Sequence, residues 1–111
     1  MSSIIESAKA LMPKLSKIRR DFHEYPETSQ NEVETSKKVA AYLKEMGCDE
    51  VIENVGGHGV IGIIHGAKEG KVVGLRADMD ALQIQEMNDV EYKSRNDGVM
   101  HACGHDNHMT G

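Results

Sequence analysis

The sequence predicts an α/β fold in which helices cover a central sheet of mixed strand direction. Two observations support this: the first half of the chain has apolar residues at helical spacing, and the second half has short β-branched runs between glycine-bearing turns. Mixed apolar runs of this kind are typical of strands that are covered on both faces. A chain of 111 residues has room for one domain at most.

The first helix is expected to run from about residue 4 to residue 24. Apolar side chains recur at three- and four-residue spacing from Ile4 to Phe22, which places them on one face of a helix. The helix should end before Tyr25-Pro26, because the residue preceding a proline is pushed out of the helical region. Pro13 lies within this stretch and is expected to kink the helix or to restart it.

A second helix is expected after a turn. Ser29 and Glu32 have the spacing of a capping box, in which each side chain accepts a hydrogen bond from the backbone of the other residue. Apolar and small residues then trace one face as far as Leu43, and Gly47 is predicted to end the helix in a left-handed conformation.

Strands are expected in the second half of the chain. The β-branched runs at residues 51–52, 60–64 and 72–75 predict three of them, and the segment 66–70 is typical of a hairpin loop between the last two. Residues 85–99 are polar and aperiodic, and this predicts a surface excursion with one short strand at most.

Composition excludes several classes of protein. The apolar fraction of 39% and the charged fraction of 28% are ordinary for a soluble protein, and no apolar run approaches the ~20 residues of a membrane span. The net charge is −5 and the basic residues are scattered, which argues against nucleic-acid or membrane partners. No secretory signal is visible, so the cytoplasm is the expected compartment, and a disulfide between Cys48 and Cys103 is the less expected use of the two cysteines.

The segment Met100-His101-Ala102-Cys103-Gly104-His105-Asp106-Asn107-His108 carries the strongest chemical signal. Cys103 and His105 are separated by one glycine, so a tight turn can direct a thiolate and an imidazole toward one metal ion. This pair favours zinc, while nearby carboxylates would also admit manganese, cobalt or nickel. His101 and His108 are balanced between roles beside the metal or the substrate and plain surface positions, and Asp106 is expected to start a helix.

A second candidate segment, Arg76 to Leu82, follows the expected strand 72–75, at the kind of strand end where α/β proteins assemble their sites. Asp80 is our candidate for orienting a metal-bound imidazole by accepting its free ring proton. A structural alternative remains open, in which Asp78 and Asp80 cap a turn and pair with Arg76. Residues 19–23, Arg-Arg-Asp-Phe-His, are explained by a charged helix end, and we expect no catalytic role for them.

Four motifs together resemble one family, the hippurate hydrolases, aminoacylases and auxin-conjugate hydrolases. They occur in the order Arg19-Arg20-Asp21-Phe22-His23, Pro26-Glu27, Leu75-Arg76-Ala77-Asp78-Met79-Asp80-Ala81-Leu82 and His101-Ala102-Cys103-Gly104-His105-Asp106. Gln83 and Asn107 depart from that family's usual proline and glycine. The most specific motif is Cys103 to Asp106, and the resemblance covers nearly the whole chain.

The resemblance implies a zinc-exopeptidase-like catalytic domain, with residues 1–111 as its N-terminal portion. It implies two divalent metal ions per site, an N-acyl amino acid as the substrate, and an inserted dimerisation domain that would make the intact enzyme a homo-oligomer. By the same resemblance Cys103 and His105 are metal ligands and Asp80 is the catalytic-domain aspartate. Asp78, His101, Asp106 and His108 are then candidates for contacts around the metal ions or with the substrate.

The family's remaining ligands and its general-base glutamate lie downstream of Gly111, so we expect residues 1–111 alone to be inactive. One alternative is a metal-binding or protein-interaction module without catalysis. Another is a nucleophilic role for Cys103, activated by His105 or His108.

Overall fold

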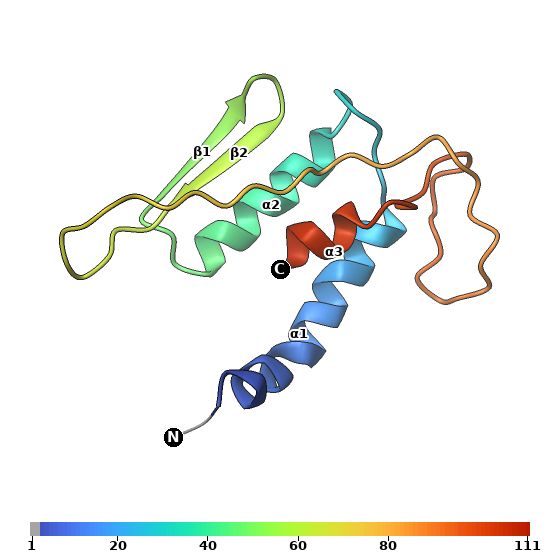
Figure 1. Cartoon of the computed structure of the whole chain (residues 1–111). Helices are drawn as coiled ribbons and strands as arrows, with labels where there is room; N and C mark the ends of the chain where they lie inside the picture. Colours follow the sequence, from blue (N-terminus) through green and yellow to red (C-terminus); the bar gives the residue numbers. More distant parts are fainter. Residues whose placement is uncertain (1–2) are drawn as a thin grey trace.

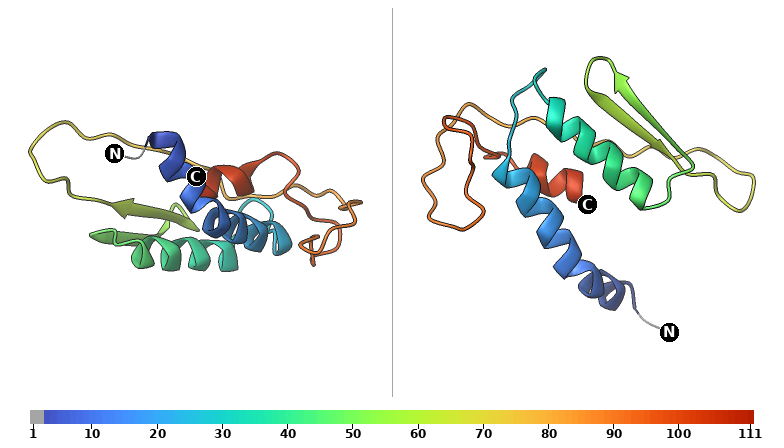
Figure 2. Two further views of the ribbon diagram at one scale, coloured as in Figure 1. Left: turned by 90° about the horizontal axis from the view of Figure 1, so that it is seen from below. Right: turned by 180° about the vertical axis from the view of Figure 1, so that it is seen from behind.

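A computed structural model describes residues 3–111, and Figure 1 shows the arrangement of the elements. In chain order these are α1 (Ile4–Glu24), α2 (Val33–Glu45), β1 (Glu50–Val55), β2 (Gly59–Ile63) and α3 (His105–Thr110). The β1–β2 hairpin packs along α2, and α3 packs against α1. Figure 2 shows that the chain between β2 and α3 runs as an extended segment past the helices.

The predicted first helix is confirmed, including its end before Tyr25. It starts with a capping box at Ser3: the Ser3 hydroxyl accepts from the Glu6 N–H at 3.1 Å, and the Glu6 carboxylate accepts from the Ser3 N–H at 3.3 Å. The helix continues through Pro13 without an interruption. Its apolar stripe contributes Ile18 and Phe22 to a small core that also contains Ala40 and Ala81.

The second helix is confirmed, but the predicted capping box at its start is wrong. The helix begins at Val33 after Glu32, whose side chain makes no capping hydrogen bond. The Glu27 carboxylate accepts from the N–H groups of Glu34 and Thr35 instead. The free N–H groups of a first turn accept any suitably placed oxygen, and a carboxylate there also interacts favourably with the helix dipole. At the other end Gly47 has a φ of +88°, as predicted.

The fold is α/β, and the sheet in residues 3–111 is a two-stranded antiparallel hairpin. Glu50 pairs with Ile63 and Ile52 with Ile61, so the run 51–52 lies in β1 and residues 60–63 lie in β2 as predicted, while Ile64 lies beyond the end of β2. The hairpin loop is not at 66–70, which is a correction: the chain turns at Gly56 and Gly57, whose φ angles are +61° and +111°. Glycine is favoured there because a β-carbon disfavours this backbone region.

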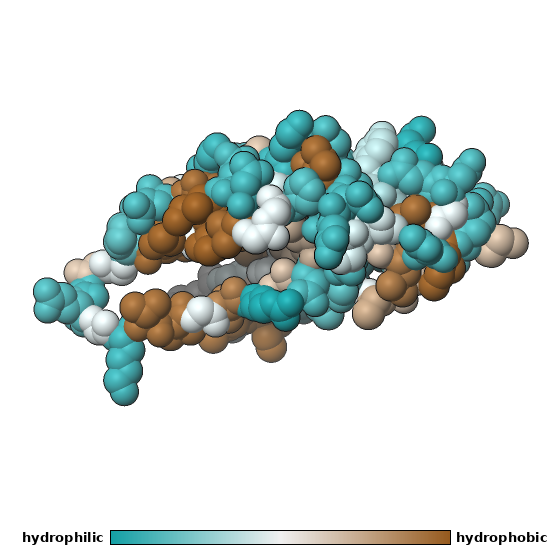
Figure 3. All heavy atoms as spheres, turned by 90° about the horizontal axis from the view of Figure 1, so that it is seen from above, coloured by the Kyte–Doolittle hydropathy of each residue, from teal (hydrophilic) through white to brown (hydrophobic). Residues whose placement is uncertain are grey.

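The third predicted strand, at residues 72–75, is not formed within the described part of the chain. Val72, Val73 and Leu75 are 97%, 84% and 99% exposed. Strand propensity reflects the fit of a side chain to a pleated, half-buried surface, and no such surface covers these residues in the described chain. Figure 3 shows apolar side chains in two rows with a hollow between them at this end of the molecule.

Two isolated backbone bridges hold the last third of the chain in place. Thr28 pairs in parallel with Ala81, and Leu82 pairs antiparallel with Met100. Between Leu82 and Met100 the chain makes the predicted polar excursion, which contains no regular strand. Because of the two bridges, the segments before Ala81 and after Met100 lie next to each other and next to the turn that follows α1.

The last helix departs from the prediction by one residue. It begins at His105, not at Asp106, after Gly104 in a left-handed conformation with a φ of +115°. Both cysteines are free. Among residues 3–111, no helix combines the length and the hydropathy that a membrane span requires.

The start of α2 provides a direct test of this structure. We expect Glu27→Ala to lower the free energy of unfolding by about 1 kcal/mol, because two N–H groups of the first turn lose their acceptor. Ser29→Ala is the matched control and should change it by less than about 0.5 kcal/mol. Urea unfolding measures both variants, and the reverse ranking would favour the capping box expected from the sequence.

Candidate metal centre

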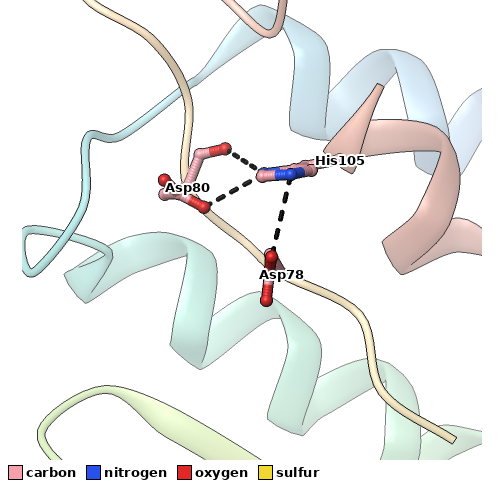
Figure 4. A group of neighbouring side chains, drawn as sticks. All are labelled: Asp78, Asp80 and His105. Atoms are coloured by element: carbon pink, nitrogen blue, oxygen red, sulfur yellow. Dashed lines mark hydrogen bonds and ion pairs between the residues drawn. The ribbon is translucent and has the colours of Figure 1, made fainter. Parts of the chain in front are cut away.

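The side chains of Asp78, Asp80 and His105 form a group of possible metal ligands. Each offers one donor atom, and these atoms all lie within 4.8 Å of one another. Figure 4 shows the two carboxylates approaching the imidazole from the extended segment, while the imidazole comes from the start of α3. Two carboxylates and an imidazole suit zinc or manganese, so the donor set fits a divalent ion.

The contacts of His105 define which of its ring nitrogens could bind a metal ion. Its Nδ1 lies 2.9 Å from the backbone oxygen of Asp80 and 3.0 Å from the Asp80 Oδ1. Both atoms are acceptors, so Nδ1 is the nitrogen that carries the proton. The Nε2 atom lies 3.8 Å from the Asp78 Oδ2, beyond hydrogen-bond distance, so this nitrogen is the one that can bind a metal ion.

Local backbone structure places these three residues. Asp80 precedes Ala81, whose N–H donates to the Glu27 carbonyl oxygen at 2.8 Å, so this end of the segment is tied to the turn after α1. Gly104 provides the left-handed turn from which His105 starts α3. Asp78 lies further from the bridges and is bound by Arg76, with 2.6 Å between the Arg76 Nη2 and the Asp78 Oδ1.

The group differs from the expected ligand set in its third member. His105 and Asp80 lie together, and Asp78, expected to be peripheral, takes part in the group. Cys103 is exposed and lies outside this group. The His108 ring is 6.0 Å from the His105 ring between centroids, and its residue is exposed.

An open cleft borders the two aspartates. It has a volume of about 880 Å³ and is lined by the turn at residues 29–32, the tip of the hairpin at 55–59 and the segment Arg76 to Asp80. The carboxylates therefore face a space large enough for a small-molecule substrate, since ligand pockets commonly have volumes of this order.

His101 and Asp106 are both buried, with 5% and 1% of their surfaces exposed. Burial lowers the pKa of His101 to about 4, so the ring is neutral at pH 7. Neither ring nitrogen of His101 has a hydrogen-bond partner among the described residues.

The expectation that residues 19–23 form only a charged helix end is wrong for His23. This histidine is 4% exposed, and its ring lies between two buried carboxylates. Its Nδ1 is 2.9 Å from the Asp106 Oδ2, and its Nε2 is 3.0 Å from both oxygens of Glu86. The Nε of Arg19 donates to the same Asp106 oxygen at 2.9 Å.

Sequence reasoning missed Glu86 completely, because it lies in the polar segment that was expected to form a surface excursion. Its carboxylate also accepts from the Ser94 N–H at 2.7 Å and from the Asn88 Nδ2 at 3.1 Å. Burial raises the pKa of Glu86, but the hydrogen bonds from His23, Ser94 and Asn88 outweigh burial and leave the pKa below its ordinary value. No signal in the sequence indicated Glu86 itself. The i, i+4 spacing of Arg19 and His23 did place both on one face of α1, and these are the two residues that contact Asp106.

Comparison with known proteins identifies relatives of this chain. Residues 74–111, which contain the whole candidate centre, match Peptidase family M20/M25/M40. The chain is 57% identical over 93 residues to thermostable carboxypeptidase 1 of Saccharolobus solfataricus, covering 83% of this chain and 23% of that protein. It is 46% identical over 108 residues to hippurate hydrolase of Campylobacter jejuni, covering 97% of this chain and 28% of that protein.

A solved structure supports the same relationship at the level of the fold. The crystal structure of a dinuclear metal binding peptidase from the M20 family of Bacillus subtilis superposes with a TM-score of 0.84 at 46% identity. The match covers 92% of this chain and 28% of that one. The chain thus spans about a quarter of the length of the relatives that it matches.

The ionised state of Glu86 leads to a test by pH. We expect Glu86→Gln to lower the free energy of unfolding at pH 7 by about 2 kcal/mol, because hydrogen bonds to a buried charge are lost. The pKa of Glu86 is lowered in the folded protein, so its contribution is complete above the ordinary value of 4.5 and is lost as the pH falls through the lower, folded-state value.

Urea unfolding of wild type and variant from pH 7 to pH 3 measures this contribution. The difference between the two proteins should be constant down to roughly pH 5 and should then decrease. A difference that stays constant down to pH 3 would contradict the assignment of Glu86 as an ionised, hydrogen-bonded carboxylate.

Proposed function

Residues 74–111 match Peptidase family M20/M25/M40, and on that premise we propose that the protein containing this chain is a metal-dependent amidohydrolase. The substrate is an N-acyl amino acid, such as hippurate or an N-acetyl amino acid. The observation that supports the proposal best is the contact of the Asp80 carboxylate with the His105 Nδ1, which leaves Nε2 available to a metal ion. A carboxylate that holds a ligating imidazole in this way is a common feature of metal sites.

The residues of this chain have separate roles in the proposed reaction. His105 would bind a divalent ion through Nε2, and Asp80 fixes the ring and its tautomer. Asp78 borders the same centre. Cys103, two residues before His105 in the sequence, is proposed as a further ligand on the strength of the family resemblance. A divalent ion bound here would polarise the amide carbonyl and make a water molecule more acidic.

The choice of substrate class rests on chemistry shared by two relatives. One relative is named a hippurate hydrolase and another a carboxypeptidase. Both names describe cleavage of an amide bond between a carbonyl group and an amino acid whose own carboxylate is free. Peptides with a free C-terminus are therefore the second substrate class to test.

The test uses the protein encoded by the natural reading frame that contains these residues. We expect it to contain bound zinc or manganese by elemental analysis and to hydrolyse N-benzoyl or N-acetyl amino acids. His105→Ala should reduce kcat/KM by at least roughly 1000-fold, since it removes a metal ligand. Asp80→Asn should reduce it by roughly 10- to 100-fold, since it disturbs the orientation and basicity of that ligand.

His65→Ala is the matched control, because His65 is an exposed histidine paired with Glu50 at the open end of the hairpin, away from the turn at Gly56 and Gly57. Its kinetic constants should equal those of the wild type. Cys103→Ser separates a ligand from a bystander: a ligand loses metal, whereas a bystander retains it. A wild-type protein that binds metal but cleaves no amide would instead favour a metal-binding module without catalysis.

A further inference from the structure

We propose that His23 and Glu86 are positioning residues for the metal centre, acting through Asp106 on its neighbour His105. This inference rests on the proposed function, because it assigns a role relative to His105 as a metal ligand. Neither residue belongs to the group of possible ligands in the described chain. His23 contacts Asp106 directly, and Glu86 contacts His23.

The need for an anchor follows from the size of α3. The helix has six residues, and no side chain caps its start. A helix of this length has little stability of its own, so its orientation depends on tertiary contacts. The strongest of these contacts are made by Asp106, which is 1% exposed and bound by Arg19 and His23 of α1.

Asp106 and His105 are consecutive, which couples the anchor to the site. Consecutive residues of an α-helix point about 100° apart. One first turn therefore has Asp106 directed into the buried contacts on α1 and His105 directed to Asp80. A rotation or shift of this turn that relaxes the Asp106 contacts also moves the His105 Nδ1 away from the two oxygens that hold it.

Glu86 decides how firmly His23 holds Asp106. Both ring nitrogens of His23 face carboxylate oxygens: Nδ1 lies 2.9 Å from the Asp106 Oδ2, and Nε2 lies 3.0 Å from the Glu86 oxygens. The ring is therefore held from both sides. Without the Glu86 carboxylate, the buried Nε2 side of the ring loses its partner, so the ring can rotate away from Asp106.

Glu86 also connects this anchor to the polar excursion. Its carboxylate accepts hydrogen bonds from Ser94 and Asn88, so it fixes residues 86–94 to α1. The nearby pair of Arg95 and Glu24, 2.6 Å apart, fastens the same excursion to the same helix but does not touch Asp106. The pair of Arg95 and Glu24 is therefore a suitable control: it joins the same two segments as the Glu86 contacts do, but it does not lead to Asp106.

The experiment compares Glu86→Gln and His23→Gln with the control Glu24→Gln in the protein encoded by the natural reading frame. Dissociation constants for zinc and manganese are measured by chelator competition, and the rise in Tm on adding each metal is measured in parallel. We expect Glu86→Gln and His23→Gln to weaken metal binding by roughly 10- to 100-fold and to reduce the metal-dependent rise in Tm. Glu24→Gln should leave both quantities at their wild-type values.

A purely structural role predicts a different pattern. The variants would then lower the Tm of the metal-free protein while the metal dissociation constants stayed as in the wild type, and this outcome would overturn the proposal. Equal weakening by Glu24→Gln would also overturn it, because the effect would then come from loosening of the excursion alone. Absence of metal binding by the wild type would reject the proposed function itself, and the positioning role with it.

A milder variant covers the case in which the two buried substitutions prevent folding. Asn88→Ala removes one hydrogen bond to Glu86 from an exposed residue and leaves every charge in place. We expect it to weaken metal binding by roughly two- to five-fold, a fraction of the loss of a whole partner. Unchanged metal affinity in Asn88→Ala, with the other two variants unfolded, would count against the proposal.

Discussion

The contact between His23 and two buried carboxylates is the interaction on which the arrangement of this chain depends. Ionised groups are costly to bury unless each has a partner and its remaining hydrogen bonds are satisfied. Glu86 and Asp106 meet that condition only because His23 lies between them and because Arg19, Ser94 and Asn88 supply further donors. This condition brings together α1, the polar excursion and the start of α3, three parts of the chain that are distant in sequence.

The core of apolar side chains is small by comparison. Four hydrophobic residues are buried in the described chain, and several large apolar residues of the hairpin and of the segment 72–75 are exposed. The elements around the candidate centre are therefore fixed largely by hydrogen bonds and charges: two backbone bridges, the carboxylate of Glu27 and the contacts of His23. Directional interactions of this kind define the geometry of a site better than apolar contact does, because they fix distances and angles between named atoms.

The tautomer of His105 connects that geometry to chemistry. Two acceptors at Nδ1 leave one nitrogen for a metal ion, and the direction of that nitrogen is given by the backbone and side chain of Asp80. Residues 74–111, which contain Asp78, Asp80 and His105, match Peptidase family M20/M25/M40, and a dinuclear metal binding peptidase is among the solved structures to which this chain is similar. Arg19 and His23 of α1 do not contact that nitrogen. They hold Asp106, the residue next to His105, and in this way they help to fix the position of the His105 ring.

The sequence by itself determined the features that depend on residues close together in the chain. Helical spacing located α1 and α2, β-branched runs located β1 and β2, and the clustered ligand-type side chains directed attention to Asp80, Cys103 and His105. It did not determine which side chains meet across the fold. His23 and Asp106 are 83 residues apart and His105 and Asp80 are 25 apart, so only the tertiary structure brings them together.

The errors have the same physical origin. Ser29 and Glu32 have the right spacing for a cap, but the oxygen that reaches the first turn of α2 belongs to Glu27, which the preceding turn brings there. Residues 72–75 have the composition of a strand, but a strand forms only when another edge supplies its hydrogen bonds. Periodicity and motif spacing record local preferences, whereas burial of a charge and pairing of an edge depend on the partners that the folded chain provides.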